Sequence, residues 1–304
     1  MIWGAGLALA SAATFGFNNV SLRRGILAGS VPQALAVTIP IGVPLFFLAA
    51  WITGELSEIG RFAPSTTVVL CAAGILHFGF GRYANYRAVR AMGSNLSGAV
   101  GEISIVVSLL LAVLLLRERL SVPQIVGIVL IFVGAFVVRE PAEPEPPEEG
   151  AVRGAHAFRP NMAEGYVYSL LSAAAYGTSP ILVRAALAQA NLPSAAGLIS
   201  SIAATIAFGA VALTSGSLPH LRAVPRAALP WFLLSGFFVG LSQVFRYVAL
   251  SLAPVVVVTP IQRLSLVFRA LFGLALNREY EAWNRRVMFA LFVALLGGVV
   301  VALG

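Results

Sequence analysis

Residues 77–102 contain the side chains most able to do chemistry, because they combine polar groups with long apolar runs. His77, Arg82, Asn85 and Glu102 all occur here. A polar group in such a run is costly unless it faces protein or water, and for that reason it often marks a functional site. This stretch is therefore the first place to look for a small-molecule site.

His77, Gly81 and Asn85 recur at four-residue spacing, so on an α-helix they share one face. The glycines at 79 and 81 leave open space beside the histidine. Two interpretations of His77 remain open. It bonds a carbonyl of a neighbouring helix, or it faces a cavity as a hydrogen-bonding or protonatable group, since an imidazole ordinarily has a pKa of roughly 6.5.

Composition sets the class of protein that must position these side chains. Of the 304 residues, 59% are hydrophobic and only 11% are charged, and the mean hydropathy is +0.91. A helix crosses the hydrocarbon core, roughly 30 Å thick, with about 20 apolar residues. The apolar runs lack the period-two alternation of a membrane barrel. We therefore predict an all-α integral membrane protein.

The charged residues exclude several kinds of chemistry. All twenty basic residues are arginine and all twelve acidic residues are glutamate. Chemistry that needs aspartate or lysine, such as P-loop phosphate binding or Schiff-base formation, is therefore absent. The arginines are scattered, which argues against a nucleic-acid face. With three histidines, no His-Glu-x-x-His motif and no nucleophile elbow, we predict no catalytic residue, no metal and no cofactor.

Ten apolar stretches predict ten transmembrane helices. The first five are expected near Ile2–Leu22, Ala34–Thr53, Thr66–Arg90, Asn95–Leu116 and Val122–Val138. The second five are expected near Tyr166–Ala188, Ser194–Thr214, Ala228–Leu252, Val255–Leu276 and Trp283–Leu303. The Pro/Glu tract that begins at Arg139 is too polar to pack between them, so it is expected to be an exposed linker.

The second set of stretches repeats the first at an offset of 161 residues, without a gap. Shared composition explains matched alanines and leucines, but it does not explain matched prolines, arginines and tyrosines. The matches include Ser11/Ser172, Gly16/Gly177, Arg23/Arg184, Pro32/Pro193, Arg61/Arg222, Pro64/Pro225, Gly79/Gly240, Tyr86/Tyr247, Ser104/Ser265 and Arg117-Glu118/Arg278-Glu279. We therefore predict a first five-helix unit at 1–138, a linker at 139–161 and a second five-helix unit at 162–304.

An odd number of spans in each unit has a topological consequence. The second unit must enter the membrane from the opposite side, which makes the two units inverted repeats around a central cavity. Two nearly equivalent halves can exchange shapes, and this exchange would switch the side to which the cavity opens. The predicted architecture therefore suits alternating access.

Several of these features together resemble the drug/metabolite transporter superfamily, and within it the EamA-type ten-helix transporters. They are the Ser-Ala-Ala and Phe/Tyr-Gly opening of each half, the tyrosine that closes each third helix, and Arg-Glu at the end of each fourth helix. The resemblance implies a basket of helices around a central cavity and export of small metabolites. The chain is also similar to bacterial amino-acid exporters, including those for aromatic amino acids, which implies a multi-pass protein of the bacterial inner membrane.

The openings of the first and sixth predicted helices supply further candidates. Asn18 follows Phe15 by one turn, and its repeat partner Ser179 precedes a proline and follows Tyr176. Small polar residues and a proline at equivalent depth predict loosened helices with free backbone groups at the site, although packing by small residues would look the same. The rings of Phe15 and Tyr176 could receive an aromatic or amphipathic substrate, or could belong to the core.

The repeat also shows where the two halves differ. Arg263 stands at the position equivalent to Glu102, so the two are expected to pair, either to fix the halves in register or to bind the two ends of a zwitterion. Gln243 and Arg246 replace Arg82 and Asn85. An otherwise symmetric carrier would hold an asymmetric substrate at such positions. Glu118, which follows an arginine at a helix end, is expected to form an interfacial ion pair.

We therefore predict a secondary transporter and not an enzyme. It would export amino acids, including aromatic ones, or similar small metabolites by alternating access. Its partners would be the small-molecule substrate, the lipid bilayer and protons as coupling ions, with no nucleic acid. Two alternatives remain open. One is a channel-like facilitator of the same architecture, and the other is a membrane-embedded lipid-modifying enzyme, against which the missing aspartate and metal cluster argue.

Overall fold

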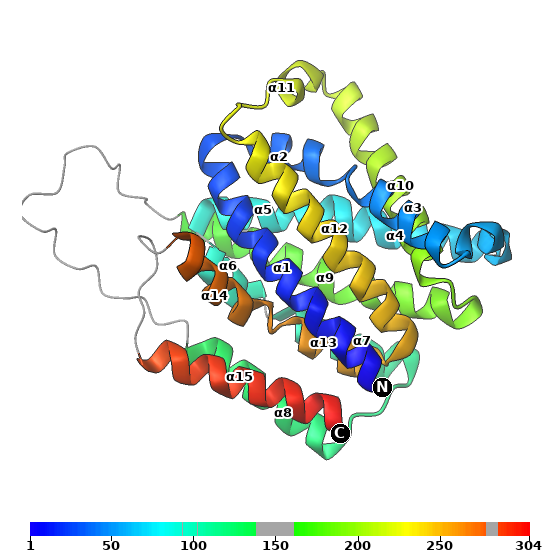
Figure 1. Cartoon of the computed structure of the whole chain (residues 1–304), viewed down its shortest axis with the longest axis vertical. Helices are drawn as coiled ribbons and strands as arrows, with labels where there is room; N and C mark the ends of the chain where they lie inside the picture. Colours follow the sequence, from blue (N-terminus) through cyan, green and yellow to red (C-terminus); the bar gives the residue numbers. More distant parts are fainter. Residues whose placement is uncertain (93, 102, 138–160, 278–284) are drawn as a thin grey trace, which may run out of the picture.

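The computed structural model describes residues 1–92, 94–101, 103–137, 161–277 and 285–304, and these residues form helices and no strands (Figure 1). The helices before the linker are α1 (Ile2–Ala28), α2 (Val31–Thr38), α3 (Gly42–Ile52), η1 (Glu55–Arg61), α4 (Pro64–Gly74), η2 (Ile75–Gly81), α5 (Arg82–Met92), α6 (Ser94–Gly101), α7 (Ile103–Leu116) and α8 (Val122–Val137). Those after it are α9 (Met162–Gln189), α10 (Pro193–Thr214), α11 (Leu218–Arg222), α12 (Leu229–Leu252), α13 (Val255–Gln262), α14 (Ser265–Asn277) and α15 (Arg285–Leu303). The all-α prediction is confirmed.

Six helical segments of the described chain are long and apolar enough to cross a membrane. They are Val31–Ile52, Pro64–Met92, Met162–Gln189, Pro193–Thr214, Leu229–Leu252 and Val255–Gly273. Ile103–Leu116 and Val122–Val133 are shorter apolar helices. The count of ten spans therefore stays a prediction.

Many large apolar side chains are exposed on the outer surface. Leu114, Ile206 and Phe292 are each about two-thirds exposed, at 64%, 67% and 65%. A protein surrounded by water rarely exposes large contiguous apolar patches. Helices with apolar residues on all sides are typical of membrane spans. The exposed apolar side chains are therefore expected to face the hydrocarbon core of a membrane.

Two of the predicted helices are interrupted where the sequence predicted continuous ones. The range Ala34–Thr53 divides into α2 and α3 around Pro40, whose ring removes a backbone N–H from the helical ladder. The range Val255–Leu276 divides at Arg263, three residues after Pro260. Both breaks leave backbone groups free of the regular ladder inside an apolar segment, which is tolerated where protein surrounds them.

The predicted helix Thr66–Arg90 is not a regular α-helix either. Its middle, Ile75–Gly81, is the π-helix η2, which is wider than an α-helix. The four-residue spacing from His77 to Gly81 therefore does not follow α-helical geometry. Turns of this type often occur at functional sites, and this one carries His77.

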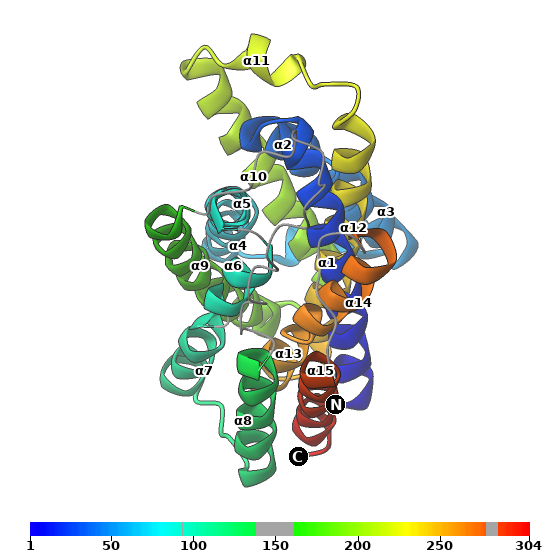
Figure 2. The same ribbon diagram turned by 90° about the vertical axis from the view of Figure 1, so that its left-hand side faces the viewer.

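The helices form one bundle with a peripheral pair. α1 packs along α12, and α9 packs against α5 and α7. α8 and α15 lie side by side along one edge of the molecule, close to both chain termini (Figures 1 and 2). Their backbones meet where a Cβ on Gly127 would lie 2.6 Å from the carbonyl oxygen of Gly297. Only small residues allow helices to approach this closely.

Several contacts occur twice in the structure, once at one set of positions and once at the positions that are equivalent under the 161-residue offset. Arg23 donates from Nη1 to the carbonyl of Val89 over 3.1 Å, and Arg184 donates in the same way to the carbonyl of Leu250 over 2.6 Å. Both members of the second pair stand 161 residues after those of the first. The packing of α1 against the backbone of α14 at Gly16 likewise has its counterpart in the packing of α9 against α7.

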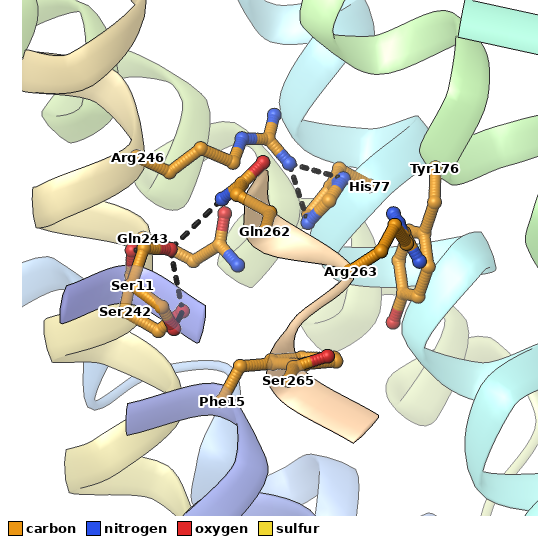
Figure 3. Close-up of a pocket in the computed structure, with 10 residues that line it drawn as sticks. All are labelled: Ser11, Phe15, His77, Tyr176, Ser242, Gln243, Arg246, Gln262, Arg263 and Ser265. Atoms are coloured by element: carbon orange, nitrogen blue, oxygen red, sulfur yellow. Dashed lines mark hydrogen bonds between the residues drawn. The ribbon is translucent and has the colours of Figure 1, made fainter. Parts of the chain in front are cut away.

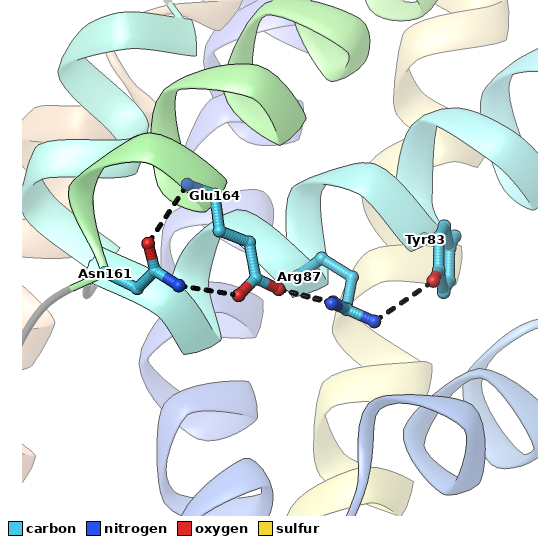
Figure 4. A network of polar contacts seen from close by, with 4 residues as sticks. All are labelled: Tyr83, Arg87, Asn161 and Glu164. Atoms are coloured by element: carbon cyan, nitrogen blue, oxygen red, sulfur yellow. Dashed lines mark hydrogen bonds and ion pairs between the residues drawn. The ribbon is translucent and has the colours of Figure 1, made fainter.

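A polar network joins α5 to the start of α9 (Figure 4). Asn161 caps α9, since its Oδ1 accepts from the Glu164 N–H over 3.2 Å. The Glu164 carboxylate accepts from Arg87 Nε over 2.9 Å, and Arg87 also contacts the Tyr83 hydroxyl. The network ties the first predicted unit to the second at one end of the bundle.

Glu118 has a role other than the predicted ion pair. Its two carboxylate oxygens accept from the backbone N–H groups of Val255 and Val256, over 3.1 and 3.0 Å. These are donors of the first turn of α13, which have no partner within the helix. The carboxylate also carries the charge that the positive end of a helix favours. Glu118 therefore fixes the start of α13 from the other half of the chain.

Replacing Glu118 by alanine is expected to lower the free energy of unfolding by about 1 kcal/mol, the usual cost of a lost helix cap. Thermal unfolding of the purified protein in detergent measures this change. Glu58→Gln is the matched control, because the Glu58–Arg61 pair lies on the surface, where such pairs contribute little. Equal melting temperatures for the two variants would contradict the capping role.

Candidate functional site

A pocket lies where α1, η2, α9, α12 and the α13–α14 break meet (Figure 3). Its empty volume, which includes space open to the exterior, is about 350 Å³. Both predicted units contribute to the wall. The lining residues are Ser11, Phe15, His77, Tyr176, Ser242, Gln243, Arg246, Gln262, Arg263 and Ser265.

His77 and Arg246 form the polar centre of the pocket. Arg246 Nη1 lies 2.8 Å from Nδ1 and 2.9 Å from Nε2 of the imidazole (Figure 3). Arg246 Nη2 donates to Ser179 Oγ over 2.9 Å. Arginine can only donate, so the imidazole must present a lone pair to it. Both side chains are buried, at 6% and 3% exposure. The contact joins η2 of the first half to α12 of the second.

A second polar cluster lies where α1 meets α12. Ser11 Oγ donates to the Ser242 carbonyl over 2.8 Å, and Ser242 Oγ donates back to the Ser11 carbonyl over 2.9 Å. Gln262 Nε2 donates to Ser11 Oγ over 2.8 Å. Gln243, also buried, lines the same side, and its Oε1 has no hydrogen-bond partner in the described structure. The cluster offers hydroxyl and amide groups to the cavity.

Phe15 and Tyr176 supply the aromatic part of the wall. Their ring centroids lie 6.5 Å apart with an interplanar angle of 83°, an edge-to-face arrangement. The two residues are equivalent under the 161-residue offset. Tyr176 also lies against His77, with 4.5 Å between ring centroids, and Gly81 leaves the space for it, because a Cβ there would lie 2.9 Å from the tyrosine ring.

Arg263 lines the pocket from the break between α13 and α14. Its Nε–H is buried and has no hydrogen-bond partner in the described part of the chain, as is also true of the Nε–H of Arg246. The predicted partner of Arg263, Glu102, lies outside the described residues. Their pairing therefore stays a prediction.

Four of the described candidates from the sequence lie outside the lining: Asn18, Asn85, Gly81 and Ser179. Asn18 is fully buried between α1 and α12, where its Oδ1 accepts from Ser235 Oγ over 2.6 Å. Asn85 lies on α5, and its buried Nδ2 has no partner in the described structure. Six of the other candidates line the pocket: Phe15, His77, Tyr176, Gln243, Arg246 and Arg263. Ser179 and Gly81 lie next to the lining residues. Ser179 accepts a hydrogen bond from Arg246, and Gly81 leaves the space that the ring of Tyr176 occupies.

Sequence reasoning did not propose Ser11, Ser242, Gln262 or Ser265 as site residues, although all four line the pocket. Ser11 and Ser265 belong to matched pairs of the repeat, which marked them as shared scaffold. Ser242 and Gln262 carry no signal of their own. Their place follows from contacts between residues more than 200 positions apart in the chain.

The chemistry of the wall is that of binding. Among the described residues, no group of three histidine, cysteine or acidic side chains could hold a metal ion. The wall combines two guanidinium groups, an imidazole, amides, hydroxyls and two aromatic rings. Such a surface can hold a polar head group and an apolar body of one small molecule.

Comparisons with known proteins agree with this architecture. The EamA-like transporter family matches residues 2–139. No curated protein matches the chain. Among the solved structures, 28 chains match; one is the crystal structure of a protein with 16% sequence identity and a TM-score of 0.68, and the match covers 99% of this chain and 96% of that one. This likeness concerns the fold alone.

The matched range holds α1, η2 and the other helices of the first half, and with them Ser11, Phe15 and His77 of the pocket. The second half of the chain also contains apolar helices long enough to cross a membrane. Residues 2–139 are similar to the EamA-like transporter family, and the apolar helices make the chain a multi-pass membrane protein.

Proposed function

We propose that the protein is a secondary transporter that exports amino acids, including aromatic ones, or similar small amphipathic metabolites across the bacterial inner membrane. Ten transmembrane helices form two inverted five-helix units, at 1–138 and 162–304, joined by the linker at 139–161. The units enclose the pocket and expose it to each side of the membrane in turn. Proton or substrate gradients supply the energy.

The observation that carries this proposal is the pocket shared by both halves. Its polar centre, His77 with Arg246, joins the two units, and its aromatic wall pairs Phe15 with its repeat equivalent Tyr176. A binding site at the interface of two repeats is the arrangement on which alternating access depends. Rocking of one unit against the other would change the pocket without breaking the fold of either.

Further support comes from the interrupted helices. The break at Arg263 and the π-helical turn at Ile75–Gly81 contribute to the wall of the pocket, and the break at Pro40 separates α2 from α3, which both pack against α12. Discontinuous helices of this kind form the substrate sites of many secondary transporters. The recurrence of contacts such as Arg23–Val89 and Arg184–Leu250 supports two units of equivalent shape.

Counterflow in proteoliposomes tests the proposal. Vesicles loaded with an unlabelled amino acid or aromatic acid and diluted into a trace of the labelled compound should accumulate the label transiently above its equilibrium level. A carrier gives this overshoot because it exchanges one molecule for another. Empty liposomes and liposomes with heat-denatured protein are the controls.

The same experiment separates the alternatives. A channel-like facilitator would let the label equilibrate without overshoot and without saturation. An absence of uptake for every compound of the panel, with protein that remains monodisperse after extraction from the vesicles, would contradict transport of this substrate class.

A further inference from the structure

We infer that the pocket selects small amphipathic organic anions, molecules that carry a carboxylate but no ammonium group, and that Arg246 and Arg263 bind the carboxylate. The inference rests on the transport function proposed above and narrows its substrate class. It separates organic acids from the amino acids that have the same apolar body.

The first step is the charge of Arg246. The side chain is buried at 3% exposure, and its two described hydrogen-bonding side chains, His77 and Ser179, carry no negative charge. They orient the guanidinium but do not neutralise it. A buried cation without a counter-charge is costly, and more so within a membrane. The Nε–H has no partner among the described residues. An incoming carboxylate would supply both the missing acceptor and the missing charge.

The second step is the presence of Arg263 in the same wall. It stands at the break between α13 and α14, and its buried Nε–H also lacks a partner among the described residues. Two guanidinium groups therefore line one small cavity, and none of the described lining residues is acidic. Arginine is well suited to a carboxylate, because its planar donors match the two oxygens.

The third step concerns where an ammonium group could go. Three of the described glutamates already have hydrogen-bond partners, and they do not line the pocket. Glu118 caps α13, Glu55 accepts from the Ala195 N–H at the start of α10 over 2.9 Å, and Glu164 pairs with Arg87. No described carboxylate thus remains to hold the ammonium of a zwitterion. Beside two arginines, an ammonium group would be repelled.

The fourth step is the apolar body of the ligand. Phe15 and Tyr176 present an edge-to-face pair of rings on the wall that also includes the arginines (Figure 3). Another aromatic ring packs favourably in such an arrangement. An aromatic carboxylic acid satisfies both parts of the wall at once.

Four ligands with one phenyl body and different head groups provide the test. They are 3-phenylpropanoate with a carboxylate, phenylalanine with both charges, 2-phenylethylamine with an ammonium, and 3-phenylpropanamide with neither. Their dissociation constants are measured by calorimetry on the full chain in lipid nanodiscs. We expect 3-phenylpropanoate to bind about 10- to 100-fold more tightly than the amide, the effect of a charge-assisted hydrogen bond. Phenylalanine and the amine should bind more weakly than 3-phenylpropanoate.

The variants Arg246→Gln and Arg263→Gln should each remove about 10-fold or more of the carboxylate affinity and lower the affinity for the amide by a smaller factor. Arg61→Gln, on the exposed surface, is the control for net charge. Arg246→Lys keeps the positive charge, so it provides a second test if Arg246→Gln does not fold. We expect Arg246→Lys to retain part of the preference for 3-phenylpropanoate over the amide. Glu102→Gln should leave the order of the four ligands unchanged.

The inference is overturned if phenylalanine or the amine binds as tightly as 3-phenylpropanoate, if no carboxylate binds, or if the arginine variants bind it as wild type does. A specific loss of phenylalanine binding in Glu102→Gln would likewise overturn it, because Glu102 would then receive the ammonium. If the ligands bind in this order but no counterflow occurs, the anion site is supported and the transport function is contradicted. If amino acids show counterflow but the ligands do not bind in this order, the transport function is supported and the anion site is contradicted.

Discussion

Gly74→Ala is expected to prevent most of the protein from accumulating in a folded state. A Cβ at this position would lie 2.0 Å from the backbone carbonyl oxygen of Ser200 and 2.7 Å from its Cα. These are main-chain atoms of α10, so no side chain can turn away to make room. Overpacking commonly costs 1–3 kcal/mol, and a clash with backbone should cost about 3 kcal/mol or more because α4 and α10 must move apart.

Gly209→Ala on α10 is the matched control, because nothing lies within 4 Å of the Cβ that it would add. Alanine favours a helix over glycine by about 1 kcal/mol, so this variant should be as stable as wild type or more stable. Fluorescence-detected size-exclusion chromatography and the melting temperature in detergent measure both variants. Equal folded yields for Gly74→Ala and Gly209→Ala would refute the close approach of α4 and α10.

His77→Phe is expected to lower the transport rate at low substrate concentration by about 10- to 100-fold. The change introduces the residue that the second half has at the equivalent position, Phe238. Arg246 then loses its imidazole acceptor, and a buried donor without a partner costs about 1–3 kcal/mol. The freed guanidinium would no longer be held where the pocket needs it. His77→Gln, which keeps an acceptor, should retain more activity than His77→Phe.

His220→Phe is the control for loss of a histidine, because His220 lies on α11, away from the pocket, and contacts Ser30. Uptake is compared at equal amounts of monodisperse protein, so that a folding defect is not counted as a transport defect. Undiminished uptake by His77→Phe would show that the His77–Arg246 contact has no part in transport.

The apolar runs were enough to predict the all-α fold and the approximate place of most helices. Length and hydropathy determine where a helix can lie in a membrane, and these are local properties of the sequence. The interruptions were not predicted, although Pro40 and Pro260 could have indicated two of them. The π-helical turn at Ile75–Gly81 has no such signal in the sequence; the two glycines at its ends, Gly74 and Gly81, pack closely against α10 and Tyr176.

The candidate residues show a similar limit. Polar and aromatic residues within apolar runs can be recognised in the sequence, and Phe15, His77 and Arg246 were proposed as site residues in this way; all three line the pocket. Rotation about the helix axis is set by packing, and it directs Asn18 to Ser235 instead of the pocket. Partners such as Gln262 and Ser11 meet only in the folded chain, so no local pattern identifies them.

The α8–α15 pair at the edge of the molecule bears on the design of mutant libraries for altered specificity. Neither helix contributes a described side chain to the lining of the pocket, and their approach at Gly127 and Gly297 tolerates no larger residue. Random substitutions there would mostly cost folded protein without changing what is bound. A library confined to α1, η2, α9, α12 and the α13–α14 break would search the selectivity of the pocket with far fewer non-functional members.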